Sequence, residues 1–360
     1  MKKSVWITWD NHRRSSELAS CWDMEYKVFE YPGWKLARYF ILSFKTLWYL
    51  YRERPVVVVC QNPSVVLAAL LATTSRIQGF FLMVDRHSNF KIRFRSSSKL
   101  KWKVFHFISD YSIRLADLTI VTNSEARNYV ESLGGKCVVL PDKMPSDLSA
   151  DAIDLKGDVN FLFICSFDGD EPVDAVLNAF KRLTDKYCIY ITGNYKKYDN
   201  WKKYVHAGNI RFLGFVGEED YLRYLNSVDA TIVLTNMPMT LNCGSYESVK
   251  ACKPQIVADS TVIKEWFRSG AVYVDPNDET SIYNGIIEII ERLDELNKKS
   301  FVVQLSQIGW CSMKGYGKWF TSSLVTNSNR GALFNIIRVL DKNLRAMTRP
   351  GRFLGWGQRH

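Results

Sequence analysis

The stretch 243–260, CGSYESVKACKPQIVADS, holds a Gly-Ser pair and a carboxylate at a spacing that could bind an anion beside a hydroxyl-bearing group. Gly244 and Ser245 open a predicted helix that lies between two apolar runs, which we expect to be buried strands. In such a unit the helix start lies at the carboxyl end of the sheet, where free amides and the helix dipole favour an anion. Glu247, on the first turn, would accept hydrogen bonds from sugar hydroxyls. The alternative is an ordinary N-cap followed by an ordinary acidic first-turn residue.

Two polar loops in the first half of the chain also follow predicted strands. Residues 10–15 (DNHRRS) follow a strand at 4–9, and Asp85, Arg86 and His87 follow a strand at 80–84. Ionisable side chains at the carboxyl ends of parallel strands are placed for chemistry, so Asp85 or His87 could take a proton from an attacking hydroxyl. The alternatives are a solvated turn with a helix-capping serine, and an aspartate cap beside a bystander histidine.

Two basic segments of the first half are candidates for a membrane surface. Residues 33–54 (GWKLARYFILSFKTLWYLYRER) predict an amphipathic helix with aromatic side chains at helical spacing and basic flanks. Such a helix suits a membrane interface, although it could instead pack its aromatic face on a sheet. The loop 91–103 (KIRFRSSSKLKWK) carries six cations and no acid. We expect contact with anionic lipid through Trp34, Lys35, Arg93, Arg95, Lys99 and Lys101.

Composition narrows the class of protein. The 360 residues carry a formal net charge of +11, which suits anionic membrane or nucleic acid, but no zinc finger, RRM signature or basic heptad region occurs. No run of 18 uncharged apolar residues predicts a spanning helix, and the start MKKSVWITWD lacks the apolar region of a signal peptide. The eight cysteines form no CxxC pair, which favours a reduced, cytosolic protein without a metal site.

Strand and helix patterns alternate twice along the chain, on either side of a polar stretch at 146–158. This predicts the α/β class, with two facing, doubly wound, Rossmann-like parallel sheets and a cleft between them. We expect domains at 1–148 and 149–300, and a helical segment with a basic tail at 301–360 that packs back towards the N-terminal domain. No G-x-G-x-x-G follows a strand and no G-x-x-x-x-G-K-[ST] occurs, so neither a dinucleotide fingerprint nor a P-loop is present.

With this layout, the chain resembles retaining glycosyltransferases of the GT-B class, of the family-4 type. The resemblance covers about 160–290 and, in layout only, 1–145. One departure is Met239, which stands where the family usually carries a second glutamate, eight residues before the one that matches Glu247. The segments that carry the resemblance are 210–214 (IRFLG), 227–234 (SVDATIVL), 246–247 (YE), 251–259 (ACKPQIVAD) and 270–276 (GAVYVDP).

The resemblance implies a glycosyltransferase that moves a sugar from a nucleotide-diphosphate-sugar donor to a lipid-linked or polysaccharide acceptor, as in bacterial-type surface glycan synthesis. It also implies metal-independent catalysis without a cofactor, in which helix amides and cations stabilise the leaving nucleotide diphosphate. The second domain would bind the donor through Thr240, Asn242, Gly244, Ser245, Tyr246, Glu247, Ser166 and Gly193. The first domain would bind the acceptor through His12, Arg13 and Arg14, with Asp10, Asp85 and His87 as catalytic candidates.

On this hypothesis the protein is cytoplasmic and peripheral on the inner face of the membrane, and it binds no nucleic acid. Three alternatives stay open. A GT-B-like sugar-nucleotide epimerase or hydrolase would share the fold but need no basic membrane face. A two-domain sugar-binding protein would bind a ligand without turnover, and a nucleic-acid-binding protein would show steep salt dependence.

Overall fold

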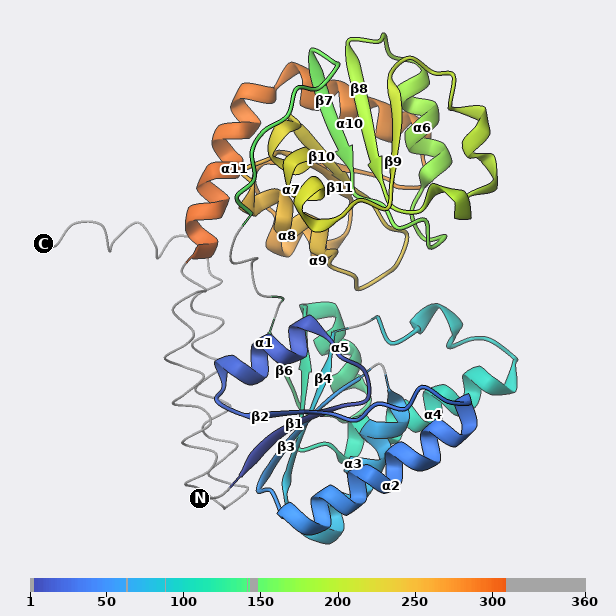
Figure 1. Cartoon of the computed structure of the whole chain (residues 1–360), viewed down its shortest axis with the longest axis vertical. Helices are drawn as coiled ribbons and strands as arrows, with labels where there is room; N and C mark the ends of the chain where they lie inside the picture. The colour runs from blue at the N-terminus through green and yellow to red at the C-terminus, as the bar shows by residue number, and fades with distance from the viewer. Residues whose placement is uncertain (1–2, 63, 88, 141, 143–147, 309–360) are drawn as a thin grey trace, which may run out of the picture. The chain divides into compact units, whose positions relative to one another are not determined.

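The computed structural model describes residues 3–62, 64–87, 89–140, 142 and 148–308 (Figure 1). These residues divide into two compact units, here called unit 1 (up to residue 142) and unit 2 (148–308). Of the helical segment and basic tail expected at 301–360, residues 301–308 belong to a helix, and 309–360 lie outside the described residues. Each unit is an α/β domain on a parallel sheet of six strands, as the alternating pattern predicted.

Unit 1 has the strand order β2-β1-β3-β4-β5-β6, and every neighbouring pair is parallel. The strand β3, VVVCQ, is buried at all five positions, as a parallel strand covered on both faces must be. The strands are β1 (Ser4–Thr8), β2 (Glu25–Val28), β3 (Val57–Gln61), β4 (Phe81–Arg86), β5 (Leu118–Val121) and β6 (Cys137–Val139).

The helices of unit 1 cover both faces of this sheet. Right-handed crossovers put α1 on one face, and α2, α3, α4 and α5 on the other, because the chain steps from β1 to the edge strand β2 before it returns. Leu42 and Leu50 of α2 and Leu67 and Leu71 of α3 form the core with the sheet. The helices are α1 (Arg13–Cys21), α2 (Lys35–Glu53), α3 (Val65–Gln78), α4 (Leu100–Leu115) and α5 (Ser124–Ser132), with a 3-10 turn η1 (Ile92–Phe94).

Unit 2 has the strand order β12-β11-β10-β7-β8-β9, again parallel throughout. β10 and β7 are central, and their residues belong to the larger of the hydrophobic cores. The strands are β7 (Val159–Phe163), β8 (Tyr187–Thr192), β9 (Ile210–Gly214), β10 (Ala230–Val233), β11 (Gln255–Ala258) and β12 (Ala271–Val274). The helices are α6 (Val173–Lys181), α7 (Glu218–Ser227), α8 (Cys243–Lys250), α9 (Thr261–Trp266), α10 (Glu279–Glu291) and α11 (Leu293–Ile308), with 3-10 turns η2 (Tyr195–Lys197) and η3 (Asp199–Lys203).

Four elements differ from what the apolar pattern of the sequence predicts. The pattern predicts neither β2 nor α9, because β2 is a half-exposed edge strand of four residues, EYKV, and α9 has only six residues. It predicts a helix at 104–115, but α4 begins at Leu100, because the basic run LKWK joins the helix. It also predicts one helix at 281–296, whereas α10 ends at Glu291 and α11 begins at Leu293.

The polar stretch between the two halves packs on unit 2 where it is described. The Asn226 side chain donates hydrogen bonds to the carbonyls of Leu148 (2.8 Å) and Ala150 (3.2 Å). The backbone N–H of Ile153 donates to the Ser227 hydroxyl at 2.7 Å. Residues 148–153 therefore run along the C-terminal end of α7.

No helix in the described part of the chain has the length and apolarity needed to span a bilayer. Seven cysteines fall within the described residues, and all seven are free thiols. Two of them, Cys60 and Cys188, lie fully buried in central strands, where they act as small apolar side chains.

Candidate functional site

The carboxyl edge of the unit 2 sheet brings together the loops after β7, β8 and β10. The Thr235 hydroxyl, just after β10, donates to Asp170 in the loop after β7 at 2.6 Å. Gly193, which follows β8, has φ +93°, and a Cβ there would lie 2.2 Å from the carbonyl oxygen of Cys165. Because only glycine allows both the positive φ and this close approach, Gly193 is needed to hold the loops after β7 and β8 together.

α8 starts at the same edge, directly behind the end of β7. A Cβ at Gly244 would lie 3.0 Å from Ile164 Cγ2, so the glycine lets the helix start approach the end of the strand closely. Asn242 is the N-cap residue and has extended backbone angles, but its side chain makes no capping hydrogen bond. Gly244 and Ser245 are buried, and the Thr240 hydroxyl donates to the carbonyl of Pro238. The Ser245 N–H already donates to the Asn242 carbonyl at 3.1 Å, so the other amides of the helix start and the helix dipole make this edge suitable for an anion.

Glu247 is held by a residue that the sequence analysis did not identify. The Tyr221 hydroxyl, from α7, donates a hydrogen bond to Glu247 Oε2. Burial and the charge of Glu247 raise the pKa of Tyr221 far above its ordinary value, so the phenol stays a proton donor. Glu247 itself is half-buried, and a carboxylate has about four lone-pair sites, so one such bond leaves it able to accept from ribose hydroxyls. The two residues are 26 positions apart in sequence, and no spacing rule connects them.

Tyr246, the neighbour of Glu247, points into the core. Its ring is 4% exposed and packs edge-on against Phe267 at a centroid distance of 5.4 Å. The structure therefore places the predicted donor residue Tyr246 in a packing position. Met239, where the family usually has glutamate, has φ +55° in the loop that leads to α8.

The loop after β7 is acidic and internally bonded. Ser166 donates from both its N–H and its hydroxyl to Glu171 Oε1, each at 2.8 Å, and Asp168 N–H donates to Glu171 Oε2 at 3.1 Å. Lys197 donates to Asp168 at 2.9 Å, and this hydrogen bond lowers the pKa of Asp168. Lys197, a cation in the loop after β8 that could neutralise a diphosphate, is thus paired with the exposed carboxylate of Asp168.

Unit 1 holds a buried charge cluster at the end of β4. Asp85 is fully buried and accepts from Arg14 Nε (3.2 Å) and Nη2 (3.2 Å). Arg14 also donates to Asp142 at 2.6 Å and to the carbonyl of Leu140 at 2.8 Å. Burial alone would raise the pKa of Asp85, but the Arg14 charge and His87 outweigh it and hold this pKa well below its ordinary value. Arg14, an expected acceptor ligand, is therefore committed to a structural ion pair, and its partner Asp142 was not anticipated.

The same carboxylate orients His87. Asp85 Oδ2 lies 3.1 Å from His87 Nδ1, and because Asp85 is ionised, Nδ1 must carry the proton in this contact. A neutral His87 then presents Nε2 as a proton acceptor. The ring of His12 lies beside it at a centroid distance of 4.7 Å, and burial together with His87 lowers the pKa of His12. This arrangement is suited to accepting a proton from a hydroxyl.

The remaining predicted residues of unit 1 are distributed over other elements. Asp10 is exposed and pairs with Arg38 of α2 at 2.6 Å, which separates it from the buried Asp85 ion pair. The side chains of Arg13 and Lys35 lie outside what the structure describes. Trp34, Arg93, Lys99 and Lys101 are exposed, whereas Arg95 donates to Asp110 at 2.8 Å and to Tyr129 at 2.6 Å.

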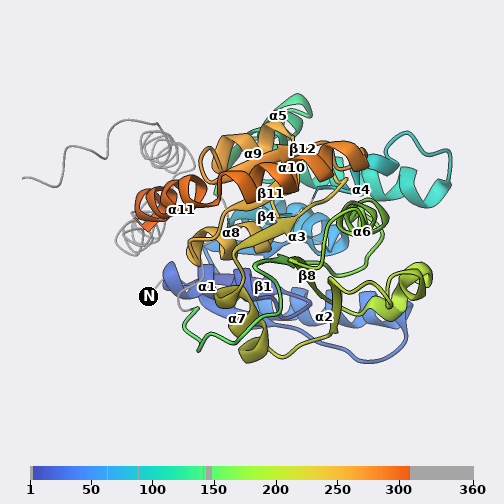
Figure 2. The same cartoon turned by 90° about the horizontal axis from the view of Figure 1, so that it is seen from above.

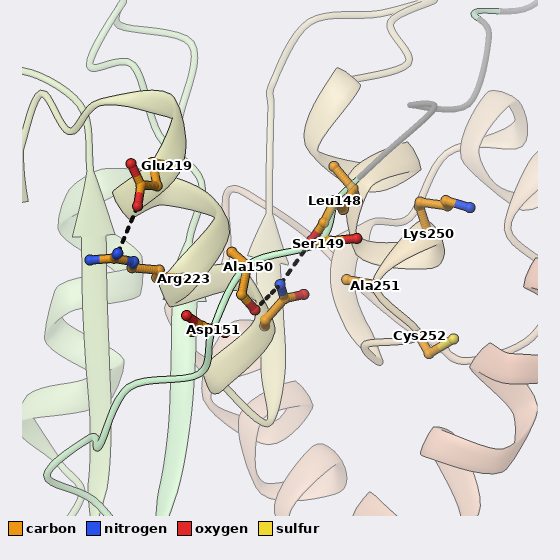
Figure 3. A pocket seen from close by; sticks show the side chains of 10 residues that line it. Leu148, Ser149, Ala150, Asp151, Glu219, Arg223, Lys250, Ala251 and Cys252 are labelled. Atoms are coloured by element: carbon orange, nitrogen blue, oxygen red, sulfur yellow. Dashed lines mark hydrogen bonds and ion pairs between the residues drawn. The ribbon is translucent and has the colours of Figure 1, made fainter.

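A pocket of about 820 Å³ lies elsewhere in unit 2, between the stretch 148–151, α7 and the C-terminal end of α8 (Figure 3). Arg223 on its wall pairs with Glu219 at 2.6 Å, and Asn226 holds the stretch 148–150 in place. Lys250, Ala251 and Cys252 line its other side. None of the predicted donor residues lines this pocket, which faces the opposite end of α8 from Gly244.

Comparisons with known proteins agree on the fold. No protein family matches the sequence, and no curated protein matches it. Among solved structures, sucrose-phosphate synthase from Thermosynechococcus elongatus is similar at a TM-score of 0.67 and 12% identity, covering 96% of this chain and 100% of that one. Anabaena HepE in complex with UDP and glucose is similar at a TM-score of 0.63 and 11% identity, covering 96% and 100%. UDP-GlcNAc 2-epimerase from Methanocaldococcus jannaschii has a TM-score of 0.53 and 12% identity, covering 80% and 92%.

These similarities establish the fold class that the sequence pattern predicted. Each unit has a parallel six-stranded sheet with flanking helices, and the chain is similar over nearly its whole length to glycosyltransferase structures with this architecture. The protein therefore has the GT-B fold. Glycosyltransferases and epimerases both occur among the similar structures, so the fold alone does not choose between the two activities.

Proposed function

We propose that this chain is a glycosyltransferase that moves a sugar from a nucleotide-diphosphate-sugar donor to a hydroxyl of a lipid-linked or polysaccharide acceptor. The observation that carries the proposal is the carboxylate of Glu247, held by Tyr221 on the first turns of a helix whose start lies at the carboxyl edge of the sheet. That arrangement offers amides to a diphosphate and a fixed carboxylate to a ribose. Two similar structures contain UDP with glucose and UDP-glucose, which supports a nucleotide-sugar donor on this fold.

In the proposed reaction, unit 2 binds the donor, and a hydroxyl of the acceptor is the nucleophile. The acceptor oxygen forms a bond to the anomeric carbon, the bond from that carbon to the diphosphate oxygen breaks, and a general base takes the acceptor proton. The α8 amides stabilise the negative charge that develops on the leaving diphosphate. We include no metal ion and no cofactor in this scheme.

The first test is thermal unfolding with UDP, GDP, ADP and dTDP and their common sugar conjugates. A ligand at about 100 times its Kd adds about 2.7 kcal/mol to the free energy of unfolding, a readily measured shift. We expect one nucleotide to stabilise the protein. Glu247→Gln should lower the affinity for that nucleotide by about 10- to 100-fold, because a hydrogen bond to a charged group contributes about 1.5–3 kcal/mol. Glu291→Gln, at the exposed end of α10, is the matched control and should leave the affinity unchanged. Equal affinity in both variants would remove Glu247 from the donor site.

A sugar-nucleotide epimerase is the second candidate, favoured by the epimerases among the similar structures. The two activities separate in one experiment: the stabilising nucleotide-sugar is incubated without an acceptor and followed by proton NMR. A transferase leaves the sugar configuration unchanged and releases the nucleotide at an appreciable rate only when an acceptor is added. Conversion to the epimer without acceptor would replace the transferase proposal.

A further inference from the structure

Large apolar side chains are exposed mainly on one side of unit 1. Of the fifteen exposed large apolar side chains in the described residues, thirteen lie on α2, on α3, on α4 or at the residue before α2. The other two, Val205 and Phe215, are single residues in unit 2. Scattered exposed apolar residues are ordinary in soluble proteins, but a contiguous group marks an interaction surface.

α2 carries the first part of this group as a stripe. Its exposed members recur every three or four residues, which places them on one face of a helix. The opposite face, formed by Leu42, Thr46 and Leu50, is fully buried against the core. One face of α2 therefore already packs against the core, and the aromatic stripe on the opposite face is exposed. The stripe consists of Leu36, Phe40, Phe44, Leu47, Trp48 and Tyr51, with exposures between 37% and 79%.

α4 carries a second stripe on its outward face. Its inward face is mixed: Ile113 is fully buried, and Ser109 and Ser112 are buried and accept hydrogen bonds from the buried guanidinium of Arg86. The outward face is apolar, since its residues recur at spacings of four, three and four. Because the inward face already supplies the contacts with the core, the packing of this domain does not explain an apolar stripe on the solvent side. This stripe consists of Leu100, Val104, Phe107 and Tyr111, with exposures between 37% and 75%.

The two stripes belong to one surface. α2, α3 and α4 lie on the same face of the sheet, and α3 contacts both α2 and α4 and lies between them in the view from above (Figure 2). Tyr111 of α4 is hydrogen-bonded to Thr73 of α3 at 3.1 Å, and Ile77 at the end of α3 is 80% exposed. Because both helices bury their other faces, both stripes point away from the sheet. We call this surface the α2–α4 face.

Cations border the α2–α4 face, and the nearby acids are already paired. Arg93 and Lys101 are exposed, and Arg93 Cζ and Lys101 Nζ lie 4.7 Å and 5.0 Å from the ring centres of Phe94 and Trp102, so both charged groups rest on aromatic surface. Asp110 is bonded to Arg95, and Glu53 to Lys3. A net positive border around aromatic and aliphatic side chains complements anionic headgroups above acyl chains.

We propose that the α2–α4 face docks on an anionic lipid bilayer, with α2 and α4 lying in the plane of the interface. The apolar stripes enter the boundary between headgroups and acyl chains, and the bordering Lys and Arg side chains reach the phosphates. A nucleic acid would match the cations but would have no use for two aliphatic and aromatic stripes. This inference is independent of the proposed transferase activity, since it requires neither donor nor acceptor.

The test is co-sedimentation of the full chain with vesicles in about 0.15 M salt and without any nucleotide-sugar. We expect binding to phosphatidylcholine vesicles that contain about 30% phosphatidylglycerol, and much weaker binding to phosphatidylcholine alone. The double variant Phe40→Ala/Phe107→Ala, with one change in each stripe, should bind anionic vesicles at least about tenfold more weakly, because the apolar area of the two rings is no longer buried in the bilayer. Lys99→Glu/Lys101→Glu should lose about fivefold or more per position. Phe215→Ala, whose ring is 90% exposed in unit 2, is the matched control and should bind as the original chain does.

All three variants change exposed side chains, so their thermal unfolding should match that of the original chain, which separates lost docking from misfolding. Failure of the full chain to bind anionic vesicles would overturn the proposal, as would equal partition of Phe40→Ala/Phe107→Ala and Phe215→Ala. Concentration-dependent self-association that Phe40→Ala/Phe107→Ala abolishes would also overturn it, and would identify the face as a contact between copies. Tight, salt-sensitive binding of RNA or DNA without vesicle binding would also overturn it.

Discussion

The two units place charged side chains at the carboxyl edges of their parallel sheets in opposite ways. In unit 1, Asp85 and Arg14 have side chains that are 0% and 6% exposed, and each is saturated by partners from the protein itself. In unit 2, the side chains of Asp168 and Lys197 are 62% and 50% exposed, and Glu247 has one protein donor on a half-buried carboxylate. The first cluster is closed and the second is open to a ligand.

This difference follows from the cost of burying charge. An ion removed from water must be paired and hydrogen-bonded, so the buried cluster of unit 1 is stable only as a complete set. The member of this cluster that can accept a proton from a ligand is His87, which is half-buried and is oriented by Asp85. Exposed or half-exposed charges cost little when they stand alone, so the edge of unit 2 can keep capacity for a ligand. Breaking the first cluster should affect folding, and altering the second should affect binding.

The largest effect should come from Asp85→Asn. Removing the negative member of a buried ion pair leaves Arg14 with only part of its compensation, and such changes lower the free energy of unfolding by about 3–5 kcal/mol. Asp10→Asn is the control, because its pair with Arg38 is exposed and such pairs contribute about 0–1 kcal/mol. Urea unfolding at pH 7 measures both.

The pH dependence of the difference in stability between the original chain and Asp85→Asn gives a sharper test. The folded pKa of Asp85 is below its unfolded value of about 3.9, so the contribution of Asp85 to stability is complete above that pH and is lost progressively as the pH falls from there through the folded pKa. The stability gap between the original chain and Asp85→Asn should therefore close on acidification below about pH 4. A gap below 1 kcal/mol at pH 7 would contradict the closed-cluster interpretation.

A smaller effect is expected from Tyr221→Phe, which removes only the hydroxyl that orients Glu247. The nucleotide keeps the Glu247 carboxylate and loses only its fixed orientation, so its affinity should fall less than in Glu247→Gln, by about 2- to 12-fold (about 0.5–1.5 kcal/mol), while the fold is retained. Tyr224→Phe on the same helix is the control, since the ring of Tyr224 packs on that of Tyr190 at a centroid distance of 5.6 Å, whereas Tyr221 is the residue that donates to Glu247. Isothermal titration of the two variants makes the comparison. An unchanged nucleotide affinity in Tyr221→Phe would mean that Tyr221 does not position Glu247.

The periodic parts of the fold were predictable from the sequence, because buried parallel strands and amphipathic helices leave strong local patterns. Apolar runs predict strands at 187–192 and 271–274, which are the observed bounds of β8 and β12, and the run VVVC indicates β3. β2 was missed because an edge strand of four residues with partly exposed side chains shows no apolar run. For α2, periodicity identified the helix but could not tell the buried face from the exposed one. Only the position of Leu42, Thr46 and Leu50 in the core resolves that ambiguity.

The candidate sites were predictable only as far as the single loops that form them. The loop after β4 and the start of α8 could be selected because each follows a strand. The partners that define their chemistry come from distant positions: Tyr221 from α7 and Asp142 from the turn after β6. Likewise, nothing local to the sequence shows that Arg14 points into the core rather than towards a ligand. Such pairings depend on the order of strands in the sheet, which is a tertiary property.

The smallest expected effect concerns His12, at the border between the closed cluster and the solvent. Burial and the nearby His87 lower the folded pKa of His12 below the unfolded value of about 6.5. Between these two pKa values the unfolded chain binds more protons than the folded one, so His12 makes the protein lose stability as the pH falls below about 6.5. His12→Asn should therefore reduce the loss of unfolding free energy between pH 7 and pH 5, with His87, Asp85 and Arg14 left in place. Urea unfolding at several pH values across this range measures the slope, and His206→Asn, on an exposed residue of unit 2, is the control. If the slope is the same in both variants, burial of His12 is not what links this cluster to pH.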